Sequence, residues 1–400
     1  MKVLFLSIST AVSDINNRGI YPDLLRYISN QGHDVFIVCP FERKTKKKTR
    51  LLQNGNVNIL GVKTLNITKT NFLEKTLATL LIEKQYNTAI NKHFSGYSFD
   101  LILYTTPPIT FNNLIEKLKL KHNARTFLML KDIFPQNAAD LCIMKENGMI
   151  YNFFRSKEKV LYRISDFIGC MSQANVNYLY KNDPEIKRDK IVICPNAIEL
   201  KNRELSNKNS ILNRYKIPNN IPIFLYGGNL GVPQGIPNLI KVLERNQSRK
   251  DCFFLIIGSG NKSNLIVDFI QKGNFDNILY IPMLERIDYD ELEACCDIGM
   301  IFLDHRFTIP NFPSRMLAYL ECKHPLLIAT DENTDIGKIA VENNFGTWSN
   351  SNDIDSICSS IDFFIKNPLK RKEMGQNGYD FLVKNYQVSN AYKSIFDKFN

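Results

Sequence analysis

The stretch "IPIFLYGGNLGVPQG", Ile221 to Gly235, decides the fold of the second half of this sequence. A short apolar run of strand length comes first, a helix follows, and four glycines stand between them. Glycine lets backbone N–H groups approach an anion closely, and a following helix adds its positive end. The loop is neither a G-x-G-x-x-G fingerprint nor a Walker loop. It predicts a β-α unit with an anion-binding turn, and a turn that needs glycine only for its geometry is the alternative.

The same rhythm of strand and helix repeats along most of the chain. Short apolar runs alternate with longer amphipathic segments, which predicts parallel sheets covered by helices on both faces. "LIIGSGN", ending at Asn261, gives a second glycine turn after the next strand, and two such turns in consecutive units favour a nucleotide site. The other predicted strands lie in "KVLFLSI", "GHDVFIVCP", "FDLILYTTPP", "ARTFLMLKDIFP", "DFIGCMSQ", "KIVICPNAIE", "NILYIPML", "DIGMIFLD", "HPLLIAT" and "FGTWS".

The alternation of predicted strands and helices is interrupted once, by a polar segment rich in Asn, Lys and Ser. We therefore predict two Rossmann-like α/β domains, residues 1–200 and 222–377, joined by a linker at 201–221 that includes a short helix. Ligands of doubly wound sheets bind beyond the C-terminal ends of the strands. Two such domains present those ends to a central cleft, so we expect the chemistry in residues that directly follow strands.

Composition narrows the class of protein. The chain has 400 residues, of which 44% are hydrophobic. Its formal net charge of +11 suggests contact with nucleic acid, anionic lipid or a diphosphate, and the alternative is a basic solvated surface. No apolar run reaches the roughly 18 residues of a membrane span, and the N-terminus resembles a first strand more than a signal peptide. Nine scattered cysteines and five isolated histidines predict reduced thiols and no metal site.

A second informative stretch is "TIPNFPSRMLAYLECKHP", Thr308 to Pro325. Pro313 suits the first position of a helix, whose first turn then presents free N–H groups and Arg315 to an anion such as a diphosphate. Glu321 lies two turns further on and has the chemistry to bind two vicinal hydroxyls, such as those of a ribose. The alternative is that Arg315 and Glu321 are ordinary surface charges.

These motifs together resemble the C-terminal half of GT-B glycosyltransferases. "GGNLGVPQG", "GSGN", "PSR" before a helix and "HPLLIATD" are similar to family-four enzymes of the branch that assembles capsule and O-antigen repeat units. "KDIFPQNAAD" and "MGQNGYDFLVKNY" resemble the same branch, and the likeness covers essentially the whole chain. It implies a nucleotide-sugar donor in the second domain, an acceptor on the first, and a C-terminal helix, about 378–400, that packs back on the first domain.

The sequence departs from the family at four positions. Asn229 and Gln234 stand where the family usually has an Arg and a Lys, so Arg315 is expected to replace those cations. Pro310 and Ala318 stand where it has two glutamates, so Glu321 is proposed as the ribose partner, and a retaining or inverting outcome stays open. The residues predicted to bind the donor are Arg18, Gly19, Gly228, Asn229, Gln234, Gly258, Met283, Leu284, Ser314, Arg315 and Glu321.

The first domain contributes two further candidates. Asp132 follows a predicted strand, and we expect it to act as base toward an acceptor hydroxyl or to orient that hydroxyl. A helix cap, or a salt bridge to Lys131 or Arg125, is the equally weighted alternative. Asn196 in "CPNAIE" resembles the family's hinge-side asparagine and is expected to shape the turn between the domains.

A basic run next to an amphipathic segment suggests a membrane surface. The run holds six cations in eight residues, and Phe72, Leu73, Leu77, Leu80 and Leu81 recur at helical spacing after it. A core-facing helix is the alternative, and nucleic acid is not expected because no aromatics interleave the cations. The cations predicted to bind the membrane are Arg43, Lys44, Lys46, Lys47, Lys48 and Arg50.

The resemblance implies a metal-independent transferase that moves a sugar from a UDP-sugar to a polyprenyl-diphosphate-linked acceptor at the cytoplasmic membrane face. N-acetylfucosamine is the sugar that the branch suggests, in capsule or O-antigen synthesis. A nucleotide-sugar 2-epimerase of the same fold, and a non-catalytic nucleotide-binding subunit, are the alternatives.

Overall fold

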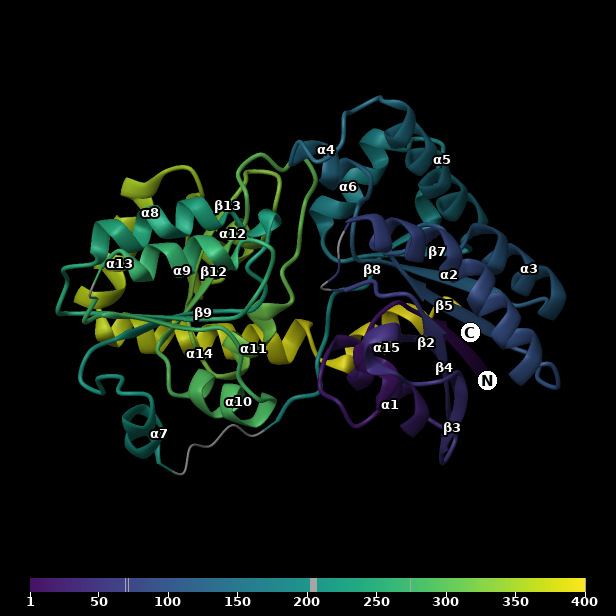
Figure 1. The fold of residues 1–400 in the computed structure, drawn as a ribbon, viewed down its shortest axis with the longest axis horizontal. Coiled ribbons are helices and arrows are strands. Elements are labelled where there is room, and N and C mark those ends of the chain that lie inside the picture. Colours follow the sequence, from purple (N-terminus) through teal and green to yellow (C-terminus); the bar gives the residue numbers. More distant parts are fainter. Residues whose placement is uncertain (69, 71, 202–206, 274, 400) are drawn as a thin grey trace. The chain divides into compact units, whose positions relative to one another are not determined.

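The computed structural model describes residues 1–68, 70, 72–201, 207–273 and 275–399, and of residues 72, 73 and 75 only the backbone. The chain forms two compact units: unit 1 comprises Met1–Glu199 and Tyr386–Asn400, and unit 2 comprises Leu200–Asn385. Each contains one sheet with helices on both faces (Figure 1).

Unit 1 is built on an eight-stranded sheet of order β3-β4-β2-β1-β5-β6-β7-β8. Its strands are β1 (Lys2–Leu6), β2 (Asp34–Glu42), β3 (Arg50–Asn54), β4 (Val57–Thr64), β5 (Leu101–Thr105), β6 (Arg125–Leu130), β7 (Phe167–Cys170) and β8 (Ile191–Ile193). Its helices are α1 (Ile20–Asn30), α2 (Phe72–His93), α3 (Asn112–His122), α4 (Gln136–Asp140), α5 (Met149–Ile164), α6 (Gln173–Asn182) and α15 (Val388–Phe396), with short 3-10 turns η1 (Thr10–Ser13), η2 (Arg43–Thr45) and η3 (Arg188–Lys190).

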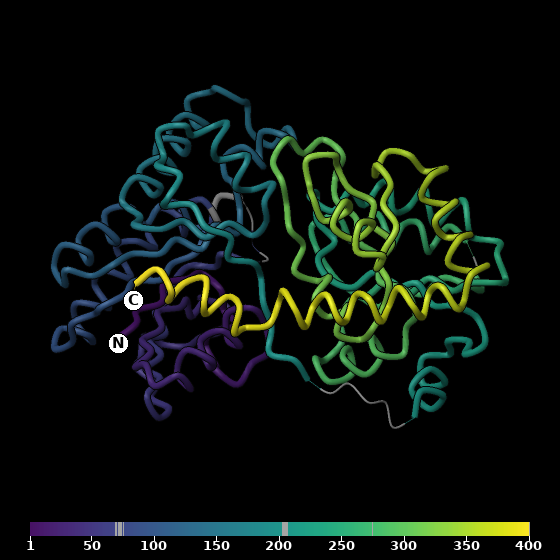
Figure 2. The backbone as a smooth tube through the Cα atoms, turned by 180° about the vertical axis from the view of Figure 1, so that it is seen from behind, coloured from purple at the N-terminus to yellow at the C-terminus, as the bar shows by residue number. Residues whose placement is uncertain are grey.

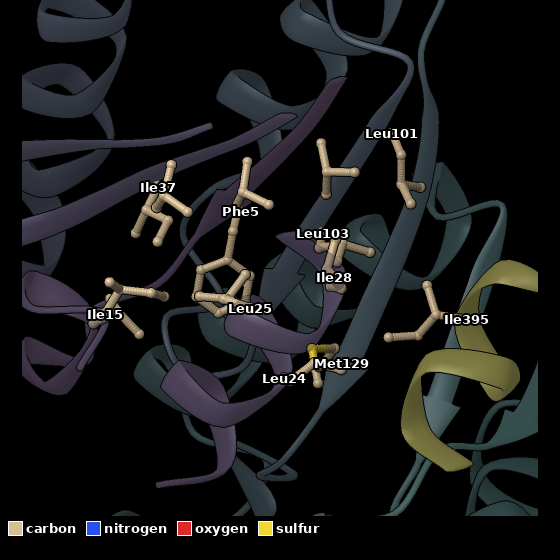
Figure 3. Close-up of a cluster of buried hydrophobic side chains, with 14 of the residues drawn as sticks. Phe5, Ile15, Leu24, Leu25, Ile28, Ile37, Leu101, Leu103, Met129 and Ile395 are labelled. Carbon is tan, nitrogen blue, oxygen red and sulfur yellow. The ribbon is translucent and has the colours of Figure 1, made fainter. Parts of the chain in front are cut away.

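The central strands are buried along their whole length, which explains their continuous apolar sequences. Helices α2, α3, α5 and α6 cover one face of the sheet, and α1 and α15 cover the other (Figure 1). On that second face Leu24, Leu25 and Ile28 of α1 and Ile395 of α15 pack against Phe5 and its strand neighbours (Figure 3). The C-terminal segment thus completes the core of unit 1, and both tube and ribbon show α15 beside α1 (Figure 2).

One strand of this sheet differs from the prediction of a wholly parallel sheet. β3 pairs antiparallel with β4 at the sheet edge, with Asn54 opposite Val57. Gly55, between the two strands, has a φ of 58°, a left-handed conformation that glycine adopts readily. The two-residue loop is Gly55–Asn56, and Gly-Asn between two strands is one of the usual signals for such a hairpin. The basic run is therefore the connection between β2 and an antiparallel edge strand.

Unit 2 has a parallel six-stranded sheet of order β11-β10-β9-β12-β13-β14. Its strands are β9 (Ile223–Gly227), β10 (Phe253–Ile257), β11 (Ile278–Ile281), β12 (Ile298–Phe302), β13 (Leu326–Thr330) and β14 (Gly346–Asn350). Its helices are α7 (Lys208–Arg214), α8 (Ile236–Asn246), α9 (Ser263–Gln271), α10 (Arg286–Ala294), α11 (Arg315–Glu321), α12 (Ile336–Glu342), α13 (Ile354–Lys366) and α14 (Pro368–Asn385), with the 3-10 turn η4 (Val232–Gln234).

The core of unit 2 lies between its sheet and α8, α9 and α13, where Phe224 of β9 stacks on Phe254 of β10 with ring centroids 5.3 Å apart. Helix α14 packs against α11. Because β9 is central, the loops after β9, β10 and β12 lie near one another at the C-terminal edge of the sheet. Five residues of the predicted 201–221 linker, 202–206, lie outside the described residues.

Candidate functional site

The two glycine turns predicted separately meet at the C-terminal edge of the unit 2 sheet. Gly228 donates its N–H to the Ile257 carbonyl at 2.8 Å, and Leu230 donates to Ser259 at 3.1 Å. A Cβ placed on Gly258, whose φ is +150°, would lie 1.8 Å from the Gly228 carbonyl oxygen. No side chain fits there, so glycine at 258 is required for the two loops to pack together.

Arg315, the first residue of α11, reaches this loop. A Cβ built on Gly228 would lie 3.4 Å from the Arg315 Cζ, and the guanidinium lies 4.7 Å from the ring centroid of Tyr226. Its Nη1 is buried without a hydrogen-bond partner. Among the described residues no carboxylate lies within ion-pair distance of it. The arginine therefore brings an uncompensated positive charge to the glycine loop.

Three tyrosines surround this arginine and fix the backbone of the loop. Tyr226 donates its hydroxyl to the Asn229 carbonyl at 2.8 Å, and the Tyr319 hydroxyl accepts the Gly227 N–H at 2.8 Å. A Cβ at Gly227 would lie 2.0 Å from the Tyr289 hydroxyl. Burial raises the pKa of all three phenols, so they stay neutral at pH 7 and do not cancel the charge of the arginine.

At the two loop positions where the resemblance implies cations, two neutral side chains form a hydrogen bond with each other. Asn229 donates its Nδ2 to the Gln234 Oε1 at 3.0 Å, and the Gly231 N–H donates to the same oxygen at 3.2 Å. Gly235, with a φ of 57°, then leads into α8. The side chains of Asn229 and Gln234 therefore stabilise the conformation of the loop.

A loop that sequence reasoning missed holds the segment before Arg315. Asp331, directly after β13, accepts the Thr334 N–H at 2.8 Å and the Thr334 hydroxyl at 2.9 Å. That hydroxyl also accepts the Asn311 N–H at 3.0 Å, and Asn333 donates its Nδ2 to the Phe307 carbonyl at 2.8 Å. Burial raises the pKa of Asp331 to about 6. The pattern Asp-x-Asn-Thr was a readable signal for such a side-chain turn.

The helix after this segment begins two residues later than predicted, at Arg315, so Pro313 lies outside it. Ser314 directly precedes the helix and is exposed. Glu321, at the other end, is buried and accepts the Lys201 N–H at 2.9 Å. Binding of a ribose by Glu321 stays a prediction. It requires that the carboxylate accept the ribose hydroxyls as well as the Lys201 N–H. Met283 and Leu284 lie between β11 and α10, and Met283 is largely exposed.

The remaining candidates lie in unit 1. Asp132 follows β6 and accepts the Asn137 Nδ2 at 2.6 Å, and its N–H donates to the Thr106 hydroxyl at 3.2 Å. Burial raises the pKa of Tyr21, a hydrogen bond to Thr105 lowers it, and the charge of Asp132 raises it further. Asp132, Tyr21 and the ends of β5 and β6 are therefore neighbours.

The two basic residues considered as salt-bridge partners of Asp132 contact other groups in the structure. Lys131 donates to the Cys194 carbonyl at 3.2 Å, and Arg125 lies 3.9 Å from Asp166. Three other candidates are placed as follows: Arg18 and Gly19 directly precede α1, and Asn196 is buried and donates to the Met171 sulfur at 3.5 Å.

The basic run forms an exposed connection, but most of its cations have partners inside unit 1. Arg43 pairs with Glu74 at 3.0 Å and Lys44 with Glu42 at 2.6 Å. Lys47 and Arg50 lie 5.1 and 5.9 Å from the ring centroid of Phe41. Among the described residues, Lys46 and Lys48 have no ion-pair or aromatic partner.

Helix α2, which follows, does not use its leucine stripe for the core. Leu77, Leu80 and Leu81 are exposed, and the buried face is formed by Ala78, Ile82, Tyr86, Ala89 and Ile90. The core-facing alternative is therefore wrong for these three leucines. The side chains of Phe72 and Leu73 lie outside the described residues. No described helix is long and apolar enough to cross a membrane.

Comparison with known proteins agrees with this architecture. The chain superposes on sucrose-phosphate synthase from Thermosynechococcus elongatus with a TM-score of 0.78 at 14% identity, covering 100% of this chain and 98% of that one. HepE from Anabaena, solved in complex with UDP, gives 0.70 at 14% identity, covering 100% and 99%. Residues 207–381 match the family model "Glycosyl transferases group 1".

The fold is therefore GT-B, as predicted, and the match of residues 207–381 to the family model bears out the predicted enzyme class, a glycosyltransferase. Curated relatives are also distant in sequence. The probable glycosyltransferase WbjE of Pseudomonas aeruginosa is 21% identical over 71% of this chain and 72% of its own length. The putative colanic acid biosynthesis glycosyl transferase WcaI of Escherichia coli K12 is 22% identical over 54% of each.

Proposed function

We propose that unit 2 binds the diphosphate of a nucleotide-sugar donor through Arg315 and the glycine loop. The observation that carries this proposal is the buried Arg315 Nη1, which has no hydrogen-bond partner, beside Gly228. A buried charge without a partner is costly, and a diphosphate oxygen would satisfy it while the loop amides bind the same anion. As the nucleotide leaves, the same charge stabilises the diphosphate on which negative charge develops.

The nucleotide we propose is UDP, because HepE, which shares the fold, has been solved with UDP and with UDP-glucose. The test is calorimetry of UDP binding to Arg315→Ala. Loss of a charge-assisted contact is worth roughly 1.5–3 kcal/mol, or about 10- to 150-fold in Kd. Arg245→Ala, which removes an exposed cation paired with Asp355, is the matched control. Equal UDP affinity in a folded Arg315→Ala protein would contradict the proposal.

The acceptor we propose is a glycan on a polyprenyl diphosphate, and Asp132 is the group that orients or deprotonates its hydroxyl. Support comes from the position of Asp132 at a strand end and from the relatives WbjE and WcaI, the second named for colanic acid biosynthesis. We propose N-acetylfucosamine as the sugar, transferred during capsule or O-antigen synthesis. Incubation with a panel of UDP-sugars and lipid-linked acceptors, followed by UDP release and product mass, tests each part. Release of free or epimerised sugar without acceptor would favour a 2-epimerase.

Docking at the cytoplasmic face of the membrane completes the proposal. The connection that contains Lys46 and Lys48 has free cations, and Leu77, Leu80 and Leu81 of the neighbouring α2 are exposed. The Arg43–Glu74 ion pair joins the two elements. Cations attract an anionic leaflet while exposed leucines enter its interfacial region. The partners we propose are thus a UDP-sugar, a lipid-linked glycan and an anionic membrane surface.

A further inference from the structure

A second group of exposed apolar side chains in unit 1 lies in the segment from the end of α4 to the first turns of α5. Figure 1 shows where these two helices are connected. We name residues 141–153 the α4–α5 elbow. Four of its large apolar side chains are exposed: Ile143 by 58%, Met149 by 91%, Ile150 by 64% and Phe153 by 46%. Clustered exposure of this kind marks an interaction surface, whereas single exposed apolar residues are ordinary.

The elbow is held in shape by contacts on its other side. Tyr151 donates its hydroxyl to the Gln136 Oε1 at 2.5 Å, and the Ile143 N–H donates to the Ala138 carbonyl at 2.9 Å. Phe154 packs edge-on against Phe134 with centroids 5.1 Å apart. Met149, Ile150 and Phe153 fall at positions i, i+1 and i+4 of α5, so they share one face of that helix. The apolar side chains are therefore presented outward by a fixed scaffold.

The charge around the elbow favours an anionic occupant over a second copy of the chain. Lys157 lies 5.8 Å from the Phe153 ring centroid, and Lys145 is exposed, with Glu146 as the one exposed acid of the elbow. Unit 1 as a whole has 30 Lys and Arg against 18 Asp and Glu, a net charge of +12. Two such units repel one another, whereas an anionic bilayer attracts each of them.

The elbow also begins close to the proposed acceptor carboxylate. Asn137, in the first turn of α4, donates its side chain to Asp132, and α4 is only five residues long. At 1.5 Å per residue the whole helix spans roughly 7.5 Å. The elbow therefore begins one short helix along the chain from the residues that contact Asp132, and a membrane bound there would be held near the hydroxyl of a lipid-linked acceptor.

We propose that the α4–α5 elbow inserts Ile143, Met149, Ile150 and Phe153 into the interface of an anionic phospholipid bilayer. The purpose of this insertion rests on the proposed lipid-linked acceptor, but the insertion itself is measured without donor or acceptor.

Cys142 supplies a reporter, because it is exposed in the elbow whereas Cys322 and Cys358 are half-buried and the other six cysteines are buried. The whole protein carrying Cys322→Ser and Cys358→Ser is labelled with an environment-sensitive fluorophore, and Cys142→Ser serves as the labelling blank. With phosphatidylglycerol-containing vesicles we expect brighter, blue-shifted emission that is quenched by lipids spin-labelled on the acyl chain. Unchanged emission at a lipid concentration where the protein sediments with the vesicles would overturn the proposal.

The double variant Met149→Ser, Ile150→Ser tests the side chains themselves. We expect at least a tenfold weaker affinity for the vesicles. Leu120→Ser on α3 (78% exposed) and Leu369→Ser on α14 (82% exposed) should leave the affinity unchanged. Equal affinity of the double variant, or lipid-free self-association that the double variant abolishes, would overturn the proposal, the second by assigning the elbow to another copy. UDP affinity measured on the same samples reports separately on the proposed function.

Discussion

The two units share an architecture but differ in how they use charge. Unit 1 carries a net charge of +12, whereas unit 2, with 21 Lys and Arg against 22 Asp and Glu, carries −1. Twelve of the large apolar side chains found exposed in the described residues belong to unit 1 and five to unit 2. In unit 2 the notable charge is that of Arg315, a half-buried arginine whose Nη1 is buried without a hydrogen-bond partner. Unit 1 thus has the chemistry of a surface that meets something large and anionic, and unit 2 that of a site for one small anion.

The largest effect we expect separates catalysis in unit 1 from nucleotide binding in unit 2. Asp132→Asn should lower the rate of transfer by about 10²- to 10⁴-fold, the usual contribution of a general base. UDP affinity should stay unchanged because the substitution lies outside unit 2. Kinetics with a lipid-linked acceptor and calorimetry with UDP measure the two quantities. Retained turnover would leave Asp132 as a structural partner of Asn137. The anomeric configuration of the product, determined by NMR, would show whether the reaction inverts.

The second prediction tests the charge difference directly. Replacing Lys46, Lys47 and Lys48 by Gln should weaken binding to anionic vesicles by roughly 3 kcal/mol, since each cation near such a surface is worth about 1 kcal/mol. Binding by the unchanged protein should fall steeply with salt, because the attraction is screened within about 10 Å at 0.1 M.

The control for this experiment is Lys241, Lys250 and Lys272 of unit 2, all exposed, replaced by Gln together. These three should leave vesicle binding unchanged. Co-sedimentation that responds to neither salt nor the unit 1 substitutions would reduce the basic run to an ordinary solvated connection. Transfer to a water-soluble acceptor analogue should be equal in all three proteins.

How far the sequence predicted these features depended on whether the deciding contacts are local. Strand-length apolar runs predicted twelve of the fourteen described strands, because a buried parallel strand needs no partner-specific pattern, but β3 and β4 were missed. The leucine stripe of α2 did not by itself decide between a membrane-facing and a core-facing helix, because α2 carries a second apolar stripe that includes Ile82 and Tyr86, and that second stripe forms the buried face. The Gly55–Asn56 turn between β3 and β4 was readable but overlooked.

The candidate site also contains features that local sequence motifs predicted and features that depend on contacts between distant segments. The glycine turns and Arg315 were visible as motifs. The cage around Arg315 was not, because Tyr226, Tyr289 and Tyr319 come from three elements that only the sheet order brings together. The bond between Asn229 and Gln234 likewise became evident only from geometry, since the sequence showed two missing cations and not their replacement.

A third prediction concerns the loop that positions Arg315. Asp331 has a pKa raised by burial to about 6, from 3.8, so its ionised form is less stable in the folded protein. Relative to Asp331→Asn, the natural protein should lose stability as the pH rises from about 3.8 to 6 and lose no more above that range. The full change is on the order of 3 kcal/mol. Urea unfolding of both proteins between pH 4 and 7.5 measures it, and a pH-independent difference would contradict the burial argument.

The smallest effect we predict tests whether unit 2 holds its anion by local geometry. The Tyr226 ring lies against the Arg315 guanidinium, and its hydroxyl donates to the Asn229 carbonyl. Tyr226→Phe keeps the ring and should leave UDP affinity within about twofold, whereas Tyr226→Leu removes the cation–π contact and should cost roughly 0.5–2 kcal/mol. Combined with Arg315→Ala, the leucine substitution should cost nothing further, because the tyrosine acts through the arginine. Additive losses in calorimetry of the double variant would show instead that Tyr226 supports the loop independently of the cation.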